Sequence, residues 1–185
     1  MIAGRHKGRR LASPSWTGLR PTSDRLRETL FDILGARVAG ARLLDACAGT
    51  GAVGIEALSR GAAHVTFVED DRRAVALIER NLRGCGIDAG YTVLARRWPL
   101  TAIDGGPFDL AWLDPPYGTA DLGPALDAAC ASTSPSGLVV LELASRRDQP
   151  VPVAPWRLAR VVRAGDSALC FYAHDPAAAS PEPRS

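Results

Sequence analysis

From residue 41 onward, short apolar runs alternate with amphipathic stretches along the chain. Short apolar runs bounded by glycine, proline or acidic residues predict buried strands, and apolar positions spaced three or four residues apart predict helices. The pattern predicts strands at 41–47, 64–70, 91–95, 107–114 and 136–144, with helices at 53–61, 72–86 and 120–132.

This alternation predicts an α/β fold, in which a mostly parallel sheet carries helices on both faces. Two further apolar segments, 156–165 and 166–174, predict a closing C-terminal hairpin. Ligands of such sheets bind at the carboxyl ends of the strands. Candidate functional residues are therefore expected where the predicted strands end.

The front of the chain follows a different pattern. Residues 1–14 alternate loosely around glycines and predict a short basic β-hairpin arm, and a helix is expected to begin at Thr22 or Ser23, which are good N-cap residues. The last residues lack bulky apolar side chains and predict a disordered tail. The expected division is a basic arm and helix at 1–35, a core at 36–174 and a tail at 175–185.

Length and composition fit one soluble domain: 185 residues, 46% hydrophobic and 23% charged. No apolar run approaches the ~20 residues that span a membrane, and the N-terminus lacks the apolar core of a secretory signal. The four cysteines form no CxxC pair and the three histidines are far apart, so we expect no metal site and no disulfide framework. A cytoplasmic monomer is the simplest expectation.

The net charge of +2 is unevenly distributed. Residues 1–27 carry seven basic side chains and one acidic side chain, so the net charge of this N-terminal part is +6 and that of the rest of the chain is −4. A basic front on an acidic body suggests a polyanionic partner, although an ordinary solvated surface would have the same charge. The basic residues in question are Arg5, Lys7, Arg9, Arg10, Arg20, Arg25 and Arg27.

A glycine loop follows the first predicted strand in LLDACAGTGAVG, where Gly49, Gly51 and Gly54 match G-x-G-x-x-G. About 20 residues later the second strand ends in Glu69 and Asp70, where an acid can hold ribose hydroxyls. This order predicts a nucleoside cofactor. NAD fits the spacing, but the carboxylate of Asp45 would repel a pyrophosphate and suits the cationic S-adenosylmethionine.

The fourth predicted strand ends in LDPPYG. Asp114 and the carbonyl of Pro115 can accept the two hydrogens of an exocyclic amine and stabilise the positive charge that develops as a methyl group arrives. Pro115 and Pro116 fix the backbone, and the ring of Tyr117 can stack on a base. The segment predicts an amino-methyltransferase site, whereas the simpler alternative is a proline turn with a surface tyrosine.

Three longer blocks, IAGRHKGRRLASP, GLRPTSDRLRETLFDIL and LLDACAGTGAVGIEALSRGAAHVTFVEDD, resemble the RsmD family, and the similarity covers roughly residues 1–175. The resemblance implies a Rossmann-like class I fold and methyl transfer from S-adenosylmethionine to N2 of a guanine in 16S ribosomal RNA, free or in a small-subunit assembly particle. It implies that the cofactor is bound by Asp45, Ala48, Gly49, Thr50, Gly51, Glu69 and Asp70, that the guanine is held by Asp114, Pro115, Pro116 and Tyr117, and that the basic residues contact RNA.

Two stretches depart from the family pattern. Cys47 replaces an aromatic or bulky apolar residue, and Arg96 and Arg97 stand where an Asp or Asn is usual near the cofactor adenine. Three alternatives remain open at this point. They are a DNA or protein amino-methyltransferase with the same DPPY site, an NAD-dependent oxidoreductase, and an RNA-binding assembly protein that has lost methyl transfer.

Overall fold

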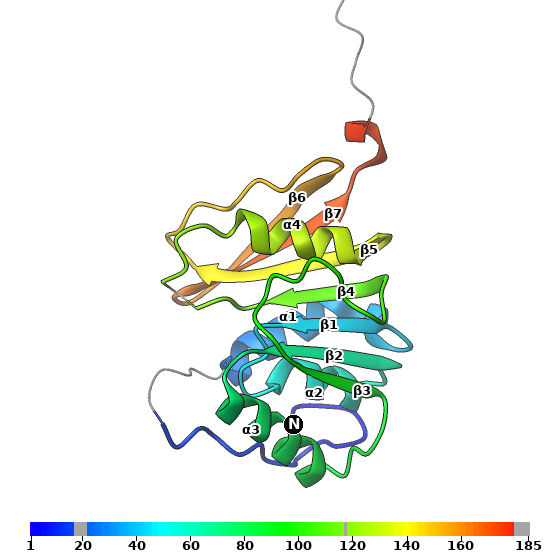
Figure 1. Cartoon of the computed structure of the whole chain (residues 1–185), viewed down its shortest axis with the longest axis vertical. Helices are drawn as coiled ribbons and strands as arrows, with labels where there is room; N and C mark the ends of the chain where they lie inside the picture. The colour runs from blue at the N-terminus through cyan, green and yellow to red at the C-terminus, as the bar shows by residue number, and fades with distance from the viewer. Residues whose placement is uncertain (17–21, 117, 180–185) are drawn as a thin grey trace, which may run out of the picture.

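A computed structural model describes residues 1–16, 22–116 and 118–179 and contains one mixed sheet. The strands are β1 (Arg42–Ala46), β2 (His64–Glu69), β3 (Tyr91–Ala95), β4 (Phe108–Leu113), β5 (Thr133–Ala144), β6 (Trp156–Ala164) and β7 (Ser167–His174). Their order across the sheet is β3-β2-β1-β4-β5-β7-β6 (Figure 1). The strands from β3 to β5 run parallel, and β7 and β6 are antiparallel, which confirms the predicted sheet and closing hairpin.

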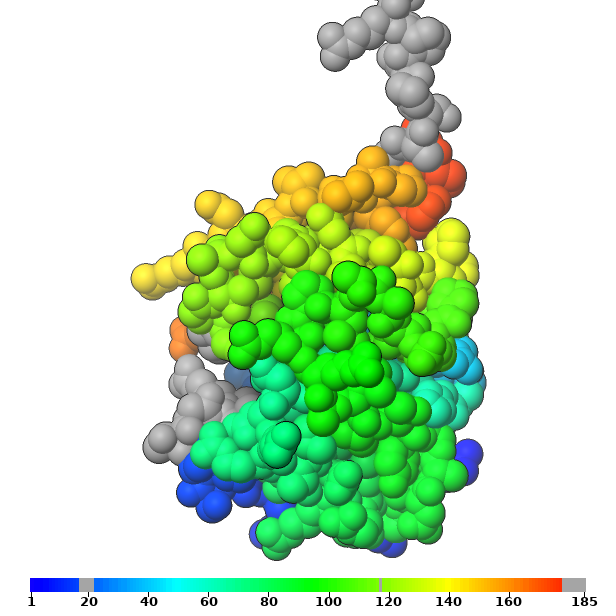
Figure 2. All heavy atoms as spheres, in the orientation of Figure 1, coloured from blue at the N-terminus to red at the C-terminus, as the bar shows by residue number. Residues whose placement is uncertain are grey.

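Helices cover both faces of the sheet. They are α1 (Asp24–Leu34), α2 (Ala52–Ser59), α3 (Arg72–Gly84) and α4 (Gly123–Ser132), with short 3₁₀ helices η1 (Gly35–Val38) and η2 (Pro176–Ala179). The first three helices pack on one face, where Phe31, Ile55 and Ile78 belong to one buried cluster with Phe67 of β2. On the opposite face, α4 and the chain between β3 and β4 form a second cluster; Figure 2 shows this chain (green) beside α4 (yellow-green).

The predicted elements and the observed ones agree to within a few residues. The N-cap of α1 is Ser23, whose hydroxyl accepts a 3.2 Å hydrogen bond from the Leu26 amide. β5 begins earlier than predicted, because Thr133 already pairs with Phe108. In the predicted tail, 176–179 form η2 and 180–185 lie outside the described residues. Within the part of the chain that the structure describes, no helix is long and apolar enough to cross a bilayer.

The prediction of an N-terminal β-hairpin arm is wrong. Residues 1–16, here called the N-terminal segment, form turns and contain no strand. The backbone amides of Ile2 and Ala3 donate to the two carboxylate oxygens of Glu56, each at 2.9 Å, and that of Ala12 donates to Asn81 Oδ1 at 2.7 Å. The segment therefore lies along α2 and α3, because side chains of these helices satisfy amides that a hairpin would have paired internally.

Asp45 holds the first turn of α2 from the neighbouring strand. The N-cap residue of this helix, Gly51, has no side chain, and a free helix start leaves amides without partners. The Asp45 carboxylate accepts a 2.8 Å hydrogen bond from the Gly54 amide and fills this role. Asp45 is only 1% exposed, and its burial raises its pKa to about 8.

Replacing Glu56 by Ala should detach the N-terminal segment. The substitution removes the acceptor for Ile2 and Ala3 and leaves Arg60 without its 2.8 Å partner in a buried ion pair. Breaking a buried pair typically costs about 3 kcal/mol or more. We expect a loss of this size in the free energy of urea unfolding, together with faster tryptic cleavage at Arg5 and Arg9.

The matched control is Glu79→Ala, which breaks an exposed helical pair with Arg83 at 3.8 Å. Pairs of this kind are worth about 0.5 kcal/mol or less. If Glu56→Ala is no more destabilising than this control and leaves the cleavage rate unchanged, the assigned anchoring role is wrong.

Asp45→Asn should change how stability depends on pH. In the folded protein Asp45 keeps its proton up to a pKa of about 8, whereas the unfolded chain loses it near 3.8. Its contribution to stability is therefore lost as pH rises through that window. The measured quantity is the free energy of urea unfolding of Asp45→Asn minus that of the unsubstituted protein. This difference should rise between pH 4 and pH 8 and stay constant above pH 8. If the two proteins show the same dependence of unfolding free energy on pH, the prediction is wrong.

Candidate functional site

The carboxyl ends of β1, β2 and β4 meet at a cleft of about 880 Å³. This arrangement follows from the strand order, because β1 lies between β2 and β4 and all three run parallel. Three groups of predicted residues line the cleft: Ala48, Gly49 and Thr50 of the glycine loop, Glu69 and Asp70 after β2, and Asp114, Pro115 and Pro116 after β4.

Two of the predicted cofactor residues, Asp45 and Gly51, do not line the cleft themselves. Asp45 is buried against the start of α2, and Gly51 is the left-handed N-cap of that helix with φ of 74°. Tyr117 lies outside the described residues. The other predicted cofactor and amine-binding residues that the structure describes thus lie together at one cleft. Asp45 and Gly51 support the glycine loop at the start of α2.

The glycine loop turns sharply and is held by a carboxylate. Cys47, Gly49 and Gly51 all have positive φ angles, of 61°, 55° and 74°. The Gly49 amide donates to Glu69 Oε2 at 2.8 Å, and the Asp71 amide donates to Glu69 Oε1 at 2.9 Å. Glu69 therefore links the loop to the start of α3, and its remaining lone pairs stay available to hydroxyl donors.

Among the described positions, Cys47 is the one residue other than glycine that has a positive φ angle, and it lines the cleft. A left-handed conformation is costly for a side chain with a Cβ, so it marks a position that the fold constrains. Burial raises the pKa of the Cys47 thiol to about 12, with further contributions from Glu69 and Asp114. The thiol stays neutral and is a poor nucleophile at ordinary pH.

The two arginines that depart from the family pattern stand on the rim of the cleft. Arg97 Nε lies 2.7 Å from Asp70 Oδ2, and the Arg97 side chain is exposed. Arg96 and the indole of Trp98 line the same wall. The guanidinium of Arg73 lies 5.0 Å from the ring centre of Trp16, and this cation–π pair also lines the cleft.

Asp114 lies half-buried directly after β4. Burial, followed by the negative charges of Glu142 and Asp45, raises its pKa well above the ordinary range, and a hydrogen bond with the Thr22 side chain lowers it in part. Sequence reasoning missed Thr22 and Glu142 as neighbours of this carboxyl. Thr22 was visible only as a possible helix cap, and Glu142 was visible only as an acid within an apolar strand.

The basic residues do not all lie on the surface. Arg5, Lys7, Arg9, Arg10 and Arg25 are exposed, whereas Arg20 lies outside the described residues. Arg27 is only 5% exposed, and its Nη2 pairs with Asp24 at 2.8 Å. Arg9, Arg10 and Arg27 line a cavity of about 530 Å³ that shares Thr22 and Thr50 with the cleft. The positive charge of the front of the chain thus adjoins the candidate site.

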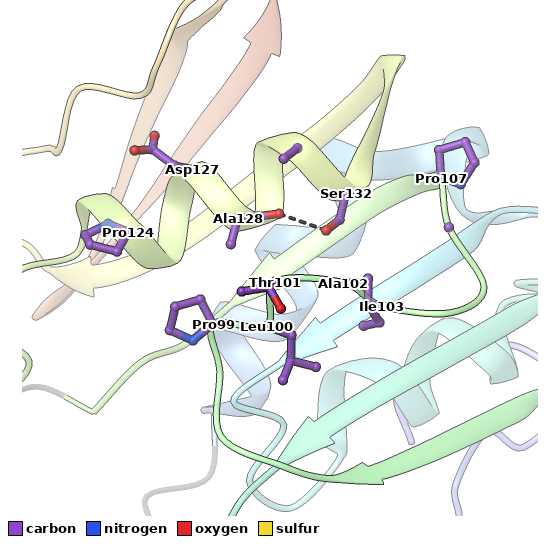
Figure 3. Close-up of a pocket in the computed structure, with 12 residues that line it drawn as sticks. Pro99, Leu100, Thr101, Ala102, Ile103, Pro107, Pro124, Asp127, Ala128 and Ser132 are labelled. Atoms are coloured by element: carbon purple, nitrogen blue, oxygen red, sulfur yellow. Dashed lines mark hydrogen bonds between the residues drawn. The ribbon is translucent and has the colours of Figure 1, made fainter.

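Another cavity, of about 730 Å³, lies between α4 and the chain that follows β3 (Figure 3). Its lining is largely apolar, including Pro99, Leu100 and Ala128. It contains none of the glycine-loop residues and none of the 114–116 segment, so the candidate chemistry is confined to the cleft. Within the described ranges, no group of three or more His, Cys, Asp or Glu side chains could hold a metal ion.

Comparison with known proteins agrees with this geometry. The family model described as conserved hypothetical protein 95 matches residues 1–173. Ribosomal RNA small subunit methyltransferase D of Escherichia coli K12 is 34% identical over 174 residues, which cover 93% of this chain and 88% of that protein.

Solved structures show the same fold. The methyltransferase candidate yhhF of Escherichia coli superimposes with a TM-score of 0.83 at 33% identity, covering 95% of this chain and 97% of that one. The Thermus thermophilus 16S rRNA N2 G1207 methyltransferase, solved with AdoMet and guanosine, has a TM-score of 0.66 at 21% identity, covering 87% and 45%. The fold is therefore that of class I adenosylmethionine-dependent methyltransferases, and the chain belongs to the RsmD family.

Proposed function

We propose that this protein transfers the methyl group of S-adenosylmethionine to the exocyclic N2 amine of a guanine in 16S ribosomal RNA. The observation that carries the proposal is the position of Asp114 and Pro115 on the same cleft as the glycine loop and Glu69. The relatives named as ribosomal RNA small subunit methyltransferases support the RNA substrate. The exposed basic residues beside the cleft suit a phosphate backbone.

The loop amides favour S-adenosylmethionine over NAD. A pyrophosphate binds to free amides at a glycine loop and a helix N-terminus. Here the Gly49 amide is bonded to Glu69 and the Gly54 amide to Asp45, so both amides are already occupied by carboxyl groups. A cleft bordered by carboxyl groups suits a positively charged ligand instead. Glu69, Asp70 and the loop from Ala48 to Thr50 would hold S-adenosylmethionine, which supplies an electrophilic methyl group.

The residues of the 114–116 segment would act on the target amine. An exocyclic amine is a weak nucleophile because its lone pair is delocalised into the ring. Asp114 would accept one amine hydrogen and the Pro115 carbonyl the other, which orients the nitrogen and stabilises its developing positive charge. Its raised pKa also allows Asp114 to take the proton that the nitrogen must lose.

The deciding experiment is transfer of labelled methyl from S-adenosylmethionine to small-subunit particles from cells that lack this protein, followed by digestion to nucleosides. Label in N2-methylguanosine is the expected result. Label in another base, or transfer only to DNA or protein, would favour the broader amino-methyltransferase class. Failure of the protein to bind S-adenosylmethionine in calorimetry would overturn the proposal and favour an RNA-binding role.

Asp114→Asn should lower kcat by about 100-fold or more, because the amide keeps the size of the side chain but loses the charge opposite the developing cation. Binding of S-adenosylmethionine, measured by calorimetry, should change little. Asp104→Asn is the control, since Asp104 is exposed and does not line the cleft. Full activity in Asp114→Asn would exclude the assigned role.

A further inference from the structure

Glu142 is a buried acid that the proposed reaction does not use. It lies near the end of β5 and is only 6% exposed. Its Oε1 accepts a 2.9 Å hydrogen bond from the Ser167 hydroxyl. Its Oε2 is buried and has no hydrogen-bond partner among the described residues. Leaving a buried polar atom unpaired is costly, so such an atom needs an explanation.

Glu142 lies beside Asp114 at the carboxyl edge of the sheet. Leu113 of β4 pairs with Leu141 of β5, so Asp114 and Glu142 each stand one residue beyond this pair on neighbouring parallel strands. Both also line one small pocket with Pro115 and Pro116. Burial, and after it the charge of Glu142, raises the pKa of Asp114, as expected for two neighbouring buried carboxyl groups.

In the part of the chain that the structure describes, no basic side chain forms an ion pair with Asp114 or Glu142. Arg147 lines the same pocket, but its Nη2 donates to the carbonyls of Thr119 and Ala120 at 2.6 and 2.9 Å. The two carboxyl groups therefore present neighbouring hydrogen-bond acceptors in a pocket of only about 10 Å³. Such a pocket admits the edge of a ligand rather than a whole ring, and that edge must bring a row of donors.

A guanine edge has such a row, because the N2 amine is next to the N1–H donor. In adenine and cytosine the exocyclic amine is next to a ring nitrogen that accepts instead. We propose that Glu142 accepts the N1–H of the target base while Asp114 accepts an N2 hydrogen, so that Glu142 selects guanine. This inference rests on the proposed function and adds the residue that reads the base. An acceptor facing the bare ring nitrogen of adenine or cytosine would stay unpaired and repel it.

The test pairs a change in the protein with a change in the base. Once the methylated position is mapped with the unsubstituted protein, particles are reconstituted with either guanosine or 2-aminopurine there. 2-Aminopurine keeps the amine but has an acceptor at N1. Glu142→Gln is close in size and can donate a hydrogen bond, so it should accept 2-aminopurine. We expect the unsubstituted protein to prefer guanosine by about 100-fold or more in kcat/KM, and Glu142→Gln to reduce this ratio at least about tenfold.

Glu79→Gln is the control and should leave the ratio unchanged, because Glu79 is exposed and does not line the pocket. Equal loss on both bases in Glu142→Gln would mean that Glu142 only supports the fold or Asp114, and would overturn the proposal. If Glu142→Gln does not fold, the unsubstituted protein decides alone: equal rates on guanosine and 2-aminopurine contradict base reading by Glu142. Absence of N2-methylguanosine from guanosine particles would instead refute the proposed function.

Discussion

Two carboxyl groups hold the glycine loop and the start of α2 by their backbone amides, and the shape of the cleft depends on these bonds. Glu69 accepts from the Gly49 amide and Asp45 from the Gly54 amide, each at 2.8 Å. Amides at such a turn and helix start would otherwise need water or a ligand anion. Because the protein itself provides the acceptors, the loop is preorganised without a ligand, and it is matched to a ligand that carries positive charge.

This arrangement concentrates acidic groups around one cleft. Asp45, Cys47 and Asp114 each have a raised pKa, mainly because they are buried and partly because neighbouring carboxylates oppose their ionisation. At the rim, Arg97 offsets the charge of Asp70 at 2.7 Å. An arginine at this position therefore has a clear electrostatic role within the protein itself. A cation bound in the cleft would relieve the same repulsion, so binding and protonation are expected to be linked.

Sequence patterns predicted the sheet, its hairpin and the meeting of three strand ends, because these follow from local periodicity and from the rules of parallel sheets. They failed for the N-terminal segment, whose amides bond to Glu56, Ser59 and Asn81 more than 50 residues away. Local spacing carries no information about such partners. Glu142 was missed for a related reason: only the pairing of β4 with β5 places it beside Asp114.

The N-terminal part of the chain and Asp114 are physically connected. The N-terminal segment is held on α2 by Glu56, and α2 is held by Asp45 beneath the glycine loop. At the start of α1, Thr22 bonds to Asp114 and lowers its pKa against the effect of burial. A polyanion bound by the exposed arginines at the front would therefore act on residues that share contacts with the loop and with Asp114. The basic segment is then part of the site's support as well as the surface that we propose for binding RNA.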